Sequence, residues 1–195
     1  MNITQNSSNI ITAISKILDN IISVNINSNV DTHLSYNIVK HTHSKCIPNI
    51  TVIDYLTRLH LHMNCSIESI IITLIYINRL MLTISHAVIN INTIHRLILS
   101  FLVLAIKYHD DVFYKMDYYA TVGGIKVQEL HLLEILLFNS INHNLHVTEF
   151  EFNEYLSIIE DTIKKYNISQ TKNNSTNCNQ SHLNNMDNLC YLYPE

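Results

Sequence analysis

The sequence predicts an all-α fold with one main domain. Apolar residues recur three and four positions apart along most of the 195-residue chain, which is the spacing of one face of a helix. The chain has only two prolines and two glycines, Gly123 and Gly124, whereas a fold built from strands needs turn-forming residues roughly every 8 to 12 positions. Because 47% of the residues are hydrophobic and only 14% are charged, the chain can fill one core.

The first half of the chain predicts three helices. An apolar stripe predicts an amphipathic helix over about residues 8–24, followed by a polar linker. Pro48 has a fixed φ that suits the first turn of the next helix, over about residues 49–63. Ser66 is a suitable N-cap for a further helix over about residues 66–82.

The helix predicted over about residues 92–109 differs from the others because apolar residues cover its whole circumference between Leu97 and Ile106. A helix of this kind must be surrounded by other helices. A charged, tyrosine-rich connection follows over residues 110–121, and apolar stripes then predict helices over about residues 127–142 and 148–165.

These elements divide the chain into three parts. We expect an N-terminal helix and polar linker over residues 1–47, a domain of five helices with a buried central third helix over residues 48–165, and an Asn-rich tail over residues 166–195. The tail has almost no apolar periodicity, so it cannot bury enough apolar surface to offset the entropy cost of ordering. We therefore expect the tail to be disordered.

Composition argues against several functional classes. P-loop NTPases, Rossmann dinucleotide sites and protein kinases each need several glycines at fixed offsets, and this chain has two adjacent glycines. The net charge of −4 comes without a clustered basic face, so we expect no nucleic-acid partner. The longest uninterrupted apolar run, Leu97 to Ile106, is about half of the roughly 20 residues that a membrane span requires, so we expect no membrane partner.

The cysteines and the polar first nine residues favour a reducing cytoplasmic or nuclear location. The four cysteines follow no zinc-binding spacing, and we expect neither a metal nor a cofactor.

The best enzyme hypothesis is a helical HD-type metal-dependent phosphohydrolase. Such a site needs His and Asp side chains that converge on one metal from several helices. The candidates are His60, His62, His95, His109, Asp110 and Asp161. His60 and His62 lie two positions apart on one predicted helix and therefore point to opposite sides, and Lys107 beside His109 opposes cation binding. The pattern does not favour this class.

Four strings of residues, in the order in which they occur, resemble the cyclin box over about residues 48–159. The last of them resembles the small P/U-type cyclins, a group with a single cyclin box. The strings are Tyr55-Leu56-Thr57-Arg58-Leu59, Tyr76-Ile77-Asn78-Arg79-Leu80, Ala105-Ile106-Lys107 with Asp110-Asp111, and Tyr119-Ala120-Thr121-Val122-Gly123-Gly124-Ile125 with Glu129 to Glu134.

The resemblance implies a regulatory subunit, not an enzyme, that forms a heterodimer with a cyclin-dependent serine/threonine protein kinase and activates it. In the family, the residues that correspond to Lys107 and Glu134 contact the kinase beside its mobile C-helix, which orders the activation segment. Asp110 and Asp111 are further candidates for kinase contact, and a solvated loop is the alternative for both. Whether the role lies in the cell cycle or in phosphate signalling stays open.

The sequence departs from the family pattern in two places. The Asp of the second string is Asn78, and residues 48–52, where mitotic cyclins carry a substrate-docking patch, read Pro-Asn-Ile-Thr-Val. A cyclin-fold interaction module for a non-kinase partner is the alternative function. The general transcription factor B family binds DNA in that way with paired basic repeats, and no such repeat is visible in this sequence.

Overall fold

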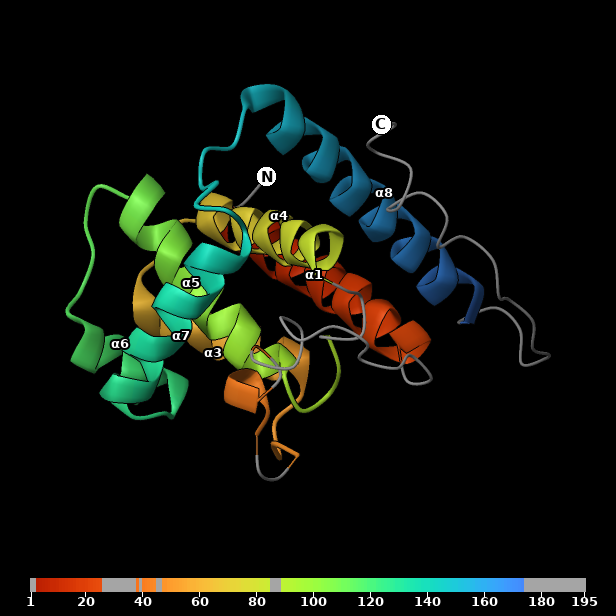
Figure 1. The fold of residues 1–195 in the computed structure, drawn as a ribbon. Coiled ribbons are helices and arrows are strands. Elements are labelled where there is room, and N and C mark those ends of the chain that lie inside the picture. Colours follow the sequence, from red (N-terminus) through yellow and green to blue (C-terminus); the bar gives the residue numbers. More distant parts are fainter. Residues whose placement is uncertain (1–2, 26–37, 39, 45–46, 85–88, 174–195) are drawn as a thin grey trace. The chain divides into compact units, whose positions relative to one another are not determined.

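The structure, a computed structural model, describes residues 3–25, 38, 40–44, 47–84 and 89–173 (Figure 1). These residues form helices and no strand, which confirms the predicted all-α fold. The helices are α1 (Ile3–Asn25), α3 (Val52–Met63), α4 (Ile67–Thr83), α5 (Ile94–His109), α6 (Met116–Gly123), α7 (Val127–Ser140) and α8 (Glu149–Asn173). The chain divides into two units after Ile163, and all side-chain contacts described below lie in the first.

Helix α5 is the centre of the first unit, as the sequence predicts. It packs against α3, α4 and α7 (Figure 1). From Ile94 to Ile106, every residue except Arg96 is buried. The apolar circumference of α5 is therefore covered by other helices, and α5 fixes the positions of the helices around it.

Helix α1 begins earlier than predicted, at Ile3, and packs on α3 and α4. Its buried stripe includes Ile10, Ile14 and Leu18, in agreement with the amphipathic pattern. Most of the predicted linker lies outside the described residues. The described part around His41 and His43 is held to α5, because Arg96 donates hydrogen bonds to both backbone carbonyls.

Helix α6 forms where the sequence predicted only a connection. Tyr119, Ala120 and Val122 are buried on its inner side, so tertiary packing stabilises this short helix. Gly124 ends it with a φ of 74°, a conformation that costs glycine little, and the N–H of Ile125 donates to the carbonyl of Ala120. The five helices around the core are therefore α3 to α7, and the helix predicted over residues 148–165 follows them as α8.

Helix α8 ends at Asn173, beyond the predicted end near residue 165. The predicted tail therefore begins with helical residues, because no glycine or proline interrupts the sequence between Glu149 and Asn173. Residues 174–195 of that tail lie outside the described residues. None of the helices in the described ranges combines the length and the apolar character that a membrane crossing needs.

Candidate functional site

The structure brings Lys107 and Glu134 together at the edge where α5 meets α7. The Lys107 Nζ lies 2.5 Å from the Glu134 Oε1, and the two side chains are 30% and 15% exposed. The two residues are 27 positions apart in the sequence. Their contact follows from the packing of α5 against α7.

Local sequence explains why each side chain reaches this edge. Lys107 is in the last turn of α5, where the buried apolar run ends at Ile106 and a cation interacts favourably with the terminal carbonyls. Glu134 directly follows Leu133, which is buried together with Leu130 and Leu137 in the stripe that packs α7 on the core. Its side chain therefore lies beside the packed stripe, within reach of α5.

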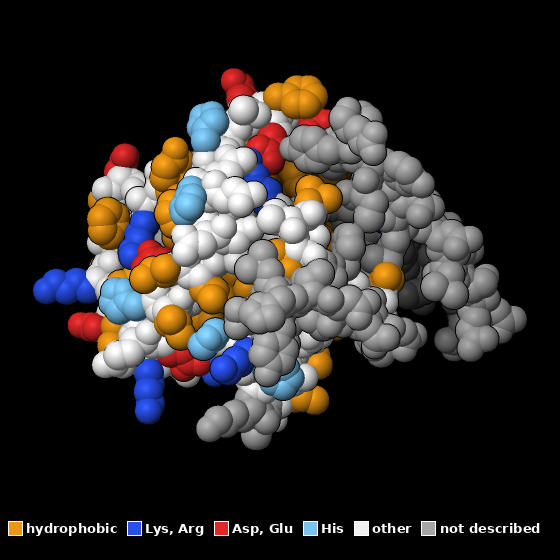
Figure 2. Space-filling model, in the orientation of Figure 1, with side chains coloured by type: hydrophobic (Ala, Val, Ile, Leu, Met, Phe, Trp, Pro, Cys, Tyr) orange, Lys and Arg blue, Asp and Glu red, His pale blue; other side chains and the backbone are white. Residues whose placement is uncertain are grey.

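Exposed apolar side chains accompany the ion pair. Tyr108 follows Lys107 and is 52% exposed, and Ile135 follows Glu134 and is 61% exposed. Leu132 on α7 is also exposed, but it lies two positions before Glu134 and therefore points to nearly the opposite side of the helix. Figure 2 shows hydrophobic side chains exposed among charged ones on the part of this face that α5, α6 and α7 form.

These apolar residues were missed by the sequence analysis. The available signal was that Leu132 and Ile135 fall outside the stripe that packs α7 on the core. Apolar side chains around a small charged pair are typical of a protein-protein contact surface. We name the set Lys107, Tyr108, Glu134 and Ile135 the α5–α7 edge.

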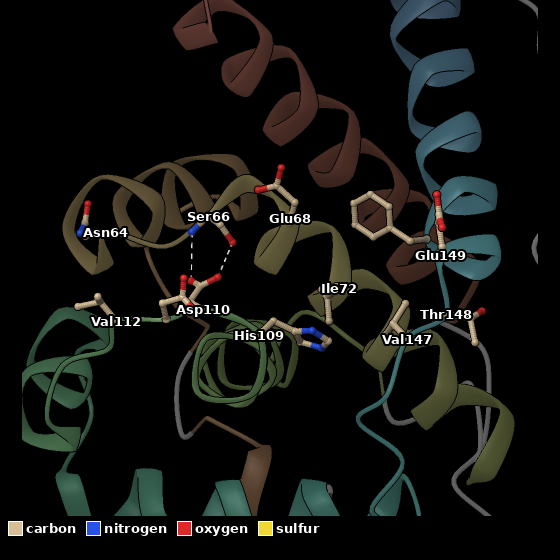
Figure 3. Close-up of a pocket in the computed structure, with 12 residues that line it drawn as sticks. Asn64, Ser66, Glu68, Ile72, His109, Asp110, Val112, Val147, Thr148 and Glu149 are labelled. Carbon is tan, nitrogen blue, oxygen red and sulfur yellow. Dashed lines mark hydrogen bonds between the residues drawn. The ribbon is translucent and has the colours of Figure 1, made fainter.

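Asp110 has an internal role. Its carboxylate accepts hydrogen bonds from the Ser66 N–H at 3.2 Å, the Ser66 Oγ at 2.6 Å and the Ser69 Oγ at 2.9 Å (Figure 3). Ser66 is also the N-cap of α4, because its Oγ accepts from the Ser69 N–H. Asp110 thus ties the end of α5 to the start of α4, and the neighbouring Asp111 is exposed.

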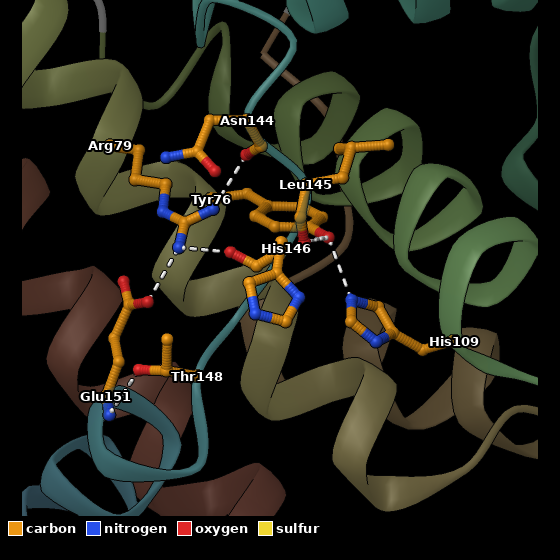
Figure 4. A network of polar contacts seen from close by, with 8 residues as sticks. All are labelled: Tyr76, Arg79, His109, Asn144, Leu145, His146, Thr148 and Glu151. Carbon is orange, nitrogen blue, oxygen red and sulfur yellow. Dashed lines mark hydrogen bonds and ion pairs between the residues drawn. The ribbon is translucent and has the colours of Figure 1, made fainter.

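On α4, the second cyclin-like string, Tyr76 to Leu80, contains two residues that hold the connection between α7 and α8 in place (Figure 4). The Tyr76 hydroxyl donates to the carbonyl of Leu145 at 2.7 Å and accepts from the Nε2 of His109 at 3.0 Å. Burial lowers the pKa of His109, so its imidazole is neutral near pH 7. These contacts position the last turn of α5, which contains Lys107.

Arg79 completes this network. It donates to the carbonyls of Asn144 and His146 and forms a 2.6 Å ion pair with Glu151 at the start of α8. The Arg79 and Glu151 side chains are only 14% and 11% exposed. Its role is therefore to fix the connection between α7 and α8.

The first string, Tyr55 to Leu59, has a comparable structural role. Its Tyr55 hydroxyl donates to the carbonyl of Gly123 at 3.0 Å and joins α3 to the end of α6. The Tyr55 ring contacts His95 edge-on, with 5.0 Å between the ring centroids.

The histidines that suggested a phosphohydrolase do not converge. His95 and His109 lie near opposite ends of α5, about 20 Å apart at 1.5 Å per residue. His60 and His62 lie in the last turn of α3. Among the residues that the structure describes, no group of three or more His, Cys, Asp or Glu side chains could hold a metal ion.

Comparison with known proteins identifies the class. The cyclin family model matches residues 7–145, which is more than half of the chain. The chain therefore belongs to the cyclin family. It is a member of the P/U type, as its similarity to individual plant cyclins shows.

The relatives come from plants and a fungus. The chain is 33% identical to Cyclin-U4-1 of Arabidopsis thaliana over 118 residues, which cover 60% of this chain and 58% of the relative. It is 30% identical to Cyclin-P4-1 of Oryza sativa subsp. japonica over 113 residues, which cover 58% of this chain and 53% of the relative. It is 39% identical to the Nuc-1 negative regulatory protein preg of Neurospora crassa over 93 residues, which cover 48% of this chain and 19% of that protein. The chain thus spans about half the length of the plant cyclins that it matches.

Proposed function

We propose that this cyclin is the regulatory subunit of a cyclin-dependent serine/threonine protein kinase, and that it binds and activates the kinase through the α5–α7 edge. The observation that supports the proposal is the Lys107–Glu134 pair, flanked by exposed apolar side chains on the two helices that form the edge. The chain itself carries out no catalysis, and it acts in the cytoplasm, the nucleus or both as a heterodimer with the kinase.

The activation mechanism follows from what a kinase needs. A protein kinase is active when its C-helix is held inward, so that its own Lys–Glu ion pair forms and its activation segment is ordered. The α5–α7 edge offers a cation and a carboxylate for hydrogen bonds to kinase backbone groups beside that helix. Tyr108 and Ile135 would bury apolar surface against the kinase and supply the hydrophobic part of the contact.

The internal ion pair prepares the edge for binding. In the free protein, Lys107 and Glu134 hold each other in place, so little side-chain entropy is lost when the kinase binds. A partly exposed pair contributes at most about 1 kcal/mol to stability, so its rearrangement toward kinase groups costs the fold little.

The two aspartates take different places in this proposal. Asp110 supports the edge from within, through its hydrogen bonds to Ser66 and Ser69. The exposed Asp111 would contact the kinase at the rim of the interface, where a charge influences association rate more than affinity.

The proposal is tested by capture and reconstitution. Tagged protein is incubated with native lysate of the source organism, and the retained kinases are identified by mass spectrometry. The identified kinase is then purified alone and assayed with and without this cyclin. We expect a stable complex and a large increase in kinase activity. Retention of no kinase, or a complex without a change in activity, would contradict the proposal.

A further inference from the structure

Arg96 is the one residue of α5 between Ile94 and Ile106 that is not buried, and it holds two other segments at once. Its Nη1 donates to the backbone carbonyls of His41 and His43 at 3.2 and 3.1 Å. Its Nη2 lies 2.7 Å from the Oε1 of Glu129, in the first turn of α7. Arg96 therefore joins the N-terminal linker to α7 across α5.

Residues 41–44, which we name the strap, have further contacts that hold them against the start of α5. Thr42 is fully buried, and its hydroxyl donates to the carbonyl of Ile38 at 2.7 Å. The N–H of Ser44 donates at 2.9 Å to the carbonyl of Asn92, just before α5. The bonds from Arg96 to the strap end on backbone carbonyls, so the position of the strap determines where these acceptors lie.

The guanidinium of Arg96 transmits this position to α7. Its two Nη atoms lie in one rigid plane, and one bonds to the strap while the other pairs with Glu129. A shift of the strap therefore moves the donor that pairs with Glu129. Because the bond to the carboxylate is charge-assisted and strong, the first turn of α7 follows the guanidinium.

The helix that Arg96 holds also carries Glu134 and Ile135 of the α5–α7 edge. Glu129 precedes Glu134 by five residues, about 7.5 Å along the helix, so ion pairs tie α7 to α5 at two separate points. In the function proposed above, the Lys107–Glu134 pair rearranges toward the kinase. The Arg96–Glu129 pair then remains to fix α7 on α5.

We propose that Arg96 is a positioning residue for kinase binding and that the strap positions Arg96. The strap contributes to kinase affinity through Arg96 and α7, without a contact of its own to the kinase. The kinase part of this inference rests on the function proposed above, whereas the coupling between the strap and α7 is a property of the free chain. Release of the strap lowers the population of the binding-competent arrangement of α7, and the apparent affinity falls by the same factor.

Hydrogen–deuterium exchange of the free, full-length chain tests the coupling. Thr42→Lys places a long cation at a fully buried position, so the strap must leave. Exchange of the α7 amides from residue 130 to 134 should then rise about fivefold or more, because this part of the helix opens more often. His43→Lys is the matched control, since it adds the same charge to the same strap at an exposed position. Its α7 should exchange like that of the wild type.

The coupling must also act in the reverse direction, because coupling between two sites is reciprocal. Glu129→Gln weakens the α7 side of the link and changes no residue of the strap. The Ser44 amide should nevertheless exchange about fivefold faster or more. Glu68→Gln, at an exposed position on α4, is the control and should leave this amide unchanged.

Kinase affinity of the same proteins tests the positioning role. Thr42→Lys, Arg96→Gln and Glu129→Gln should each weaken binding about fivefold or more, and both control variants should bind normally. Thr42 is buried, so a loss on its replacement does not come from a missing contact with the kinase. Thr42→Lys combined with Glu129→Gln should weaken binding little more than either change alone, because both act on one link.

The outcomes separate this proposal from the proposed function. Unchanged α7 exchange in Thr42→Lys, or an unchanged Ser44 amide in Glu129→Gln, would overturn the coupling whether or not the chain binds a kinase. Faster α7 exchange with wild-type kinase affinity would overturn the positioning role and leave the kinase function in place. If the wild type binds no kinase, the proposed function is wrong, and exchange still decides the coupling. If circular dichroism shows that Thr42→Lys does not fold, Glu129→Gln and its control decide both points.

Discussion

Arg79 belongs to the second cyclin-like string, Tyr76 to Leu80, and it connects this part of α4 to the rest of the fold. Its guanidinium satisfies two backbone carbonyls and one carboxylate at the connection between α7 and α8. Because the side chain is mostly buried, each of these groups would lose a partner without ready replacement by water. Arg79 therefore contributes to stability through three interactions at once.

This arrangement predicts strong coupling between Arg79 and Glu151. Arg79→Ala and Glu151→Ala should each lower the free energy of unfolding by about 2 to 3 kcal/mol, because each leaves a largely buried charge without its partner. The double variant should lose clearly less than the sum, by about 1 kcal/mol or more. Urea denaturation of the three variants measures this, with the exposed Arg58→Ala as control. Additive losses would show that the ion pair contributes nothing of its own.

At the scale of elements, α5 determines whether the fold forms. Phe101 is fully buried in the middle of this helix, whereas Tyr108 near its end is exposed. Phe101→Asp should unfold the protein, because an unpaired buried charge costs several kcal/mol and a domain of this size has only about 5 to 15 kcal/mol of stability. Tyr108→Asp is the matched control on the same helix and should keep the wild-type melting temperature within a few degrees. Circular dichroism compares the two, and a helical, cooperatively melting Phe101→Asp variant would show that α5 is not central.

The elements also show how far sequence predicts this fold. The burial of α5 was predictable because its apolar residues cover every side of the helix. Helix α6 was not, because its eight residues carry little periodicity and depend on Tyr119 and Val122 reaching the core. For α8 the sequence predicts too early an end, because low apolar content favours disorder although no glycine or proline breaks the helix before Asn173.

The site was only partly predictable for a similar reason. Lys107 and Glu134 were identified through the family resemblance, and their contact depends on how α5 and α7 pack. Ser66 was predictable as an N-cap from local sequence alone. Its bond to Asp110, 44 residues later, was not, because it requires the end of α5 to meet the start of α4.

At the scale of the whole molecule, one buried and two half-buried histidines should make stability depend on pH. Burial lowers the pKa values of His60, His95 and His109 below the usual value of about 6.5. As pH falls through about 6.5, these histidines gain protons in the unfolded state while they stay neutral in the folded state. The unfolded state then binds more protons, so stability falls toward lower pH until the folded pKa values are reached.

We therefore expect the free energy of unfolding to fall between about pH 7.5 and about pH 5.5. His95 is the most buried of the three, and its Nε2 bonds to the carbonyl of Ile50. In His95→Gln, an amide that does not titrate replaces the imidazole, so the free energy of unfolding should fall less over this pH range. His62→Gln, at an exposed position, should keep the wild-type loss. Urea denaturation at about pH 7.5 and about pH 5.5 measures the loss of stability in the wild type and both variants. An identical loss in all three proteins would exclude His95 as a source of the pH dependence.

The central claim is that the α5–α7 edge binds and activates a kinase, and a charge swap tests it most directly. Lys107→Glu with Glu134→Lys restores the ion pair in reverse and presents opposite charges to the partner. The matched control is Lys16→Glu with Asp19→Lys on the exposed side of α1.

Kinase affinity of the two swapped proteins, measured together with their melting temperatures, is the decisive comparison. Both proteins should melt near the wild type. The reversed Lys107–Glu134 pair keeps an ion pair at the same place, and Lys16 and Asp19 are exposed, where substitutions usually change stability by about 0.5 kcal/mol or less. Only the Lys107–Glu134 swap should weaken kinase binding, by roughly 30-fold or more, since mispairing close interfacial charges costs at least about 2 kcal/mol. If the Lys107–Glu134 swap unfolds the protein, the pair has a structural role. If the swapped protein binds and activates the kinase like the wild type, the claim that the α5–α7 edge binds the kinase is wrong.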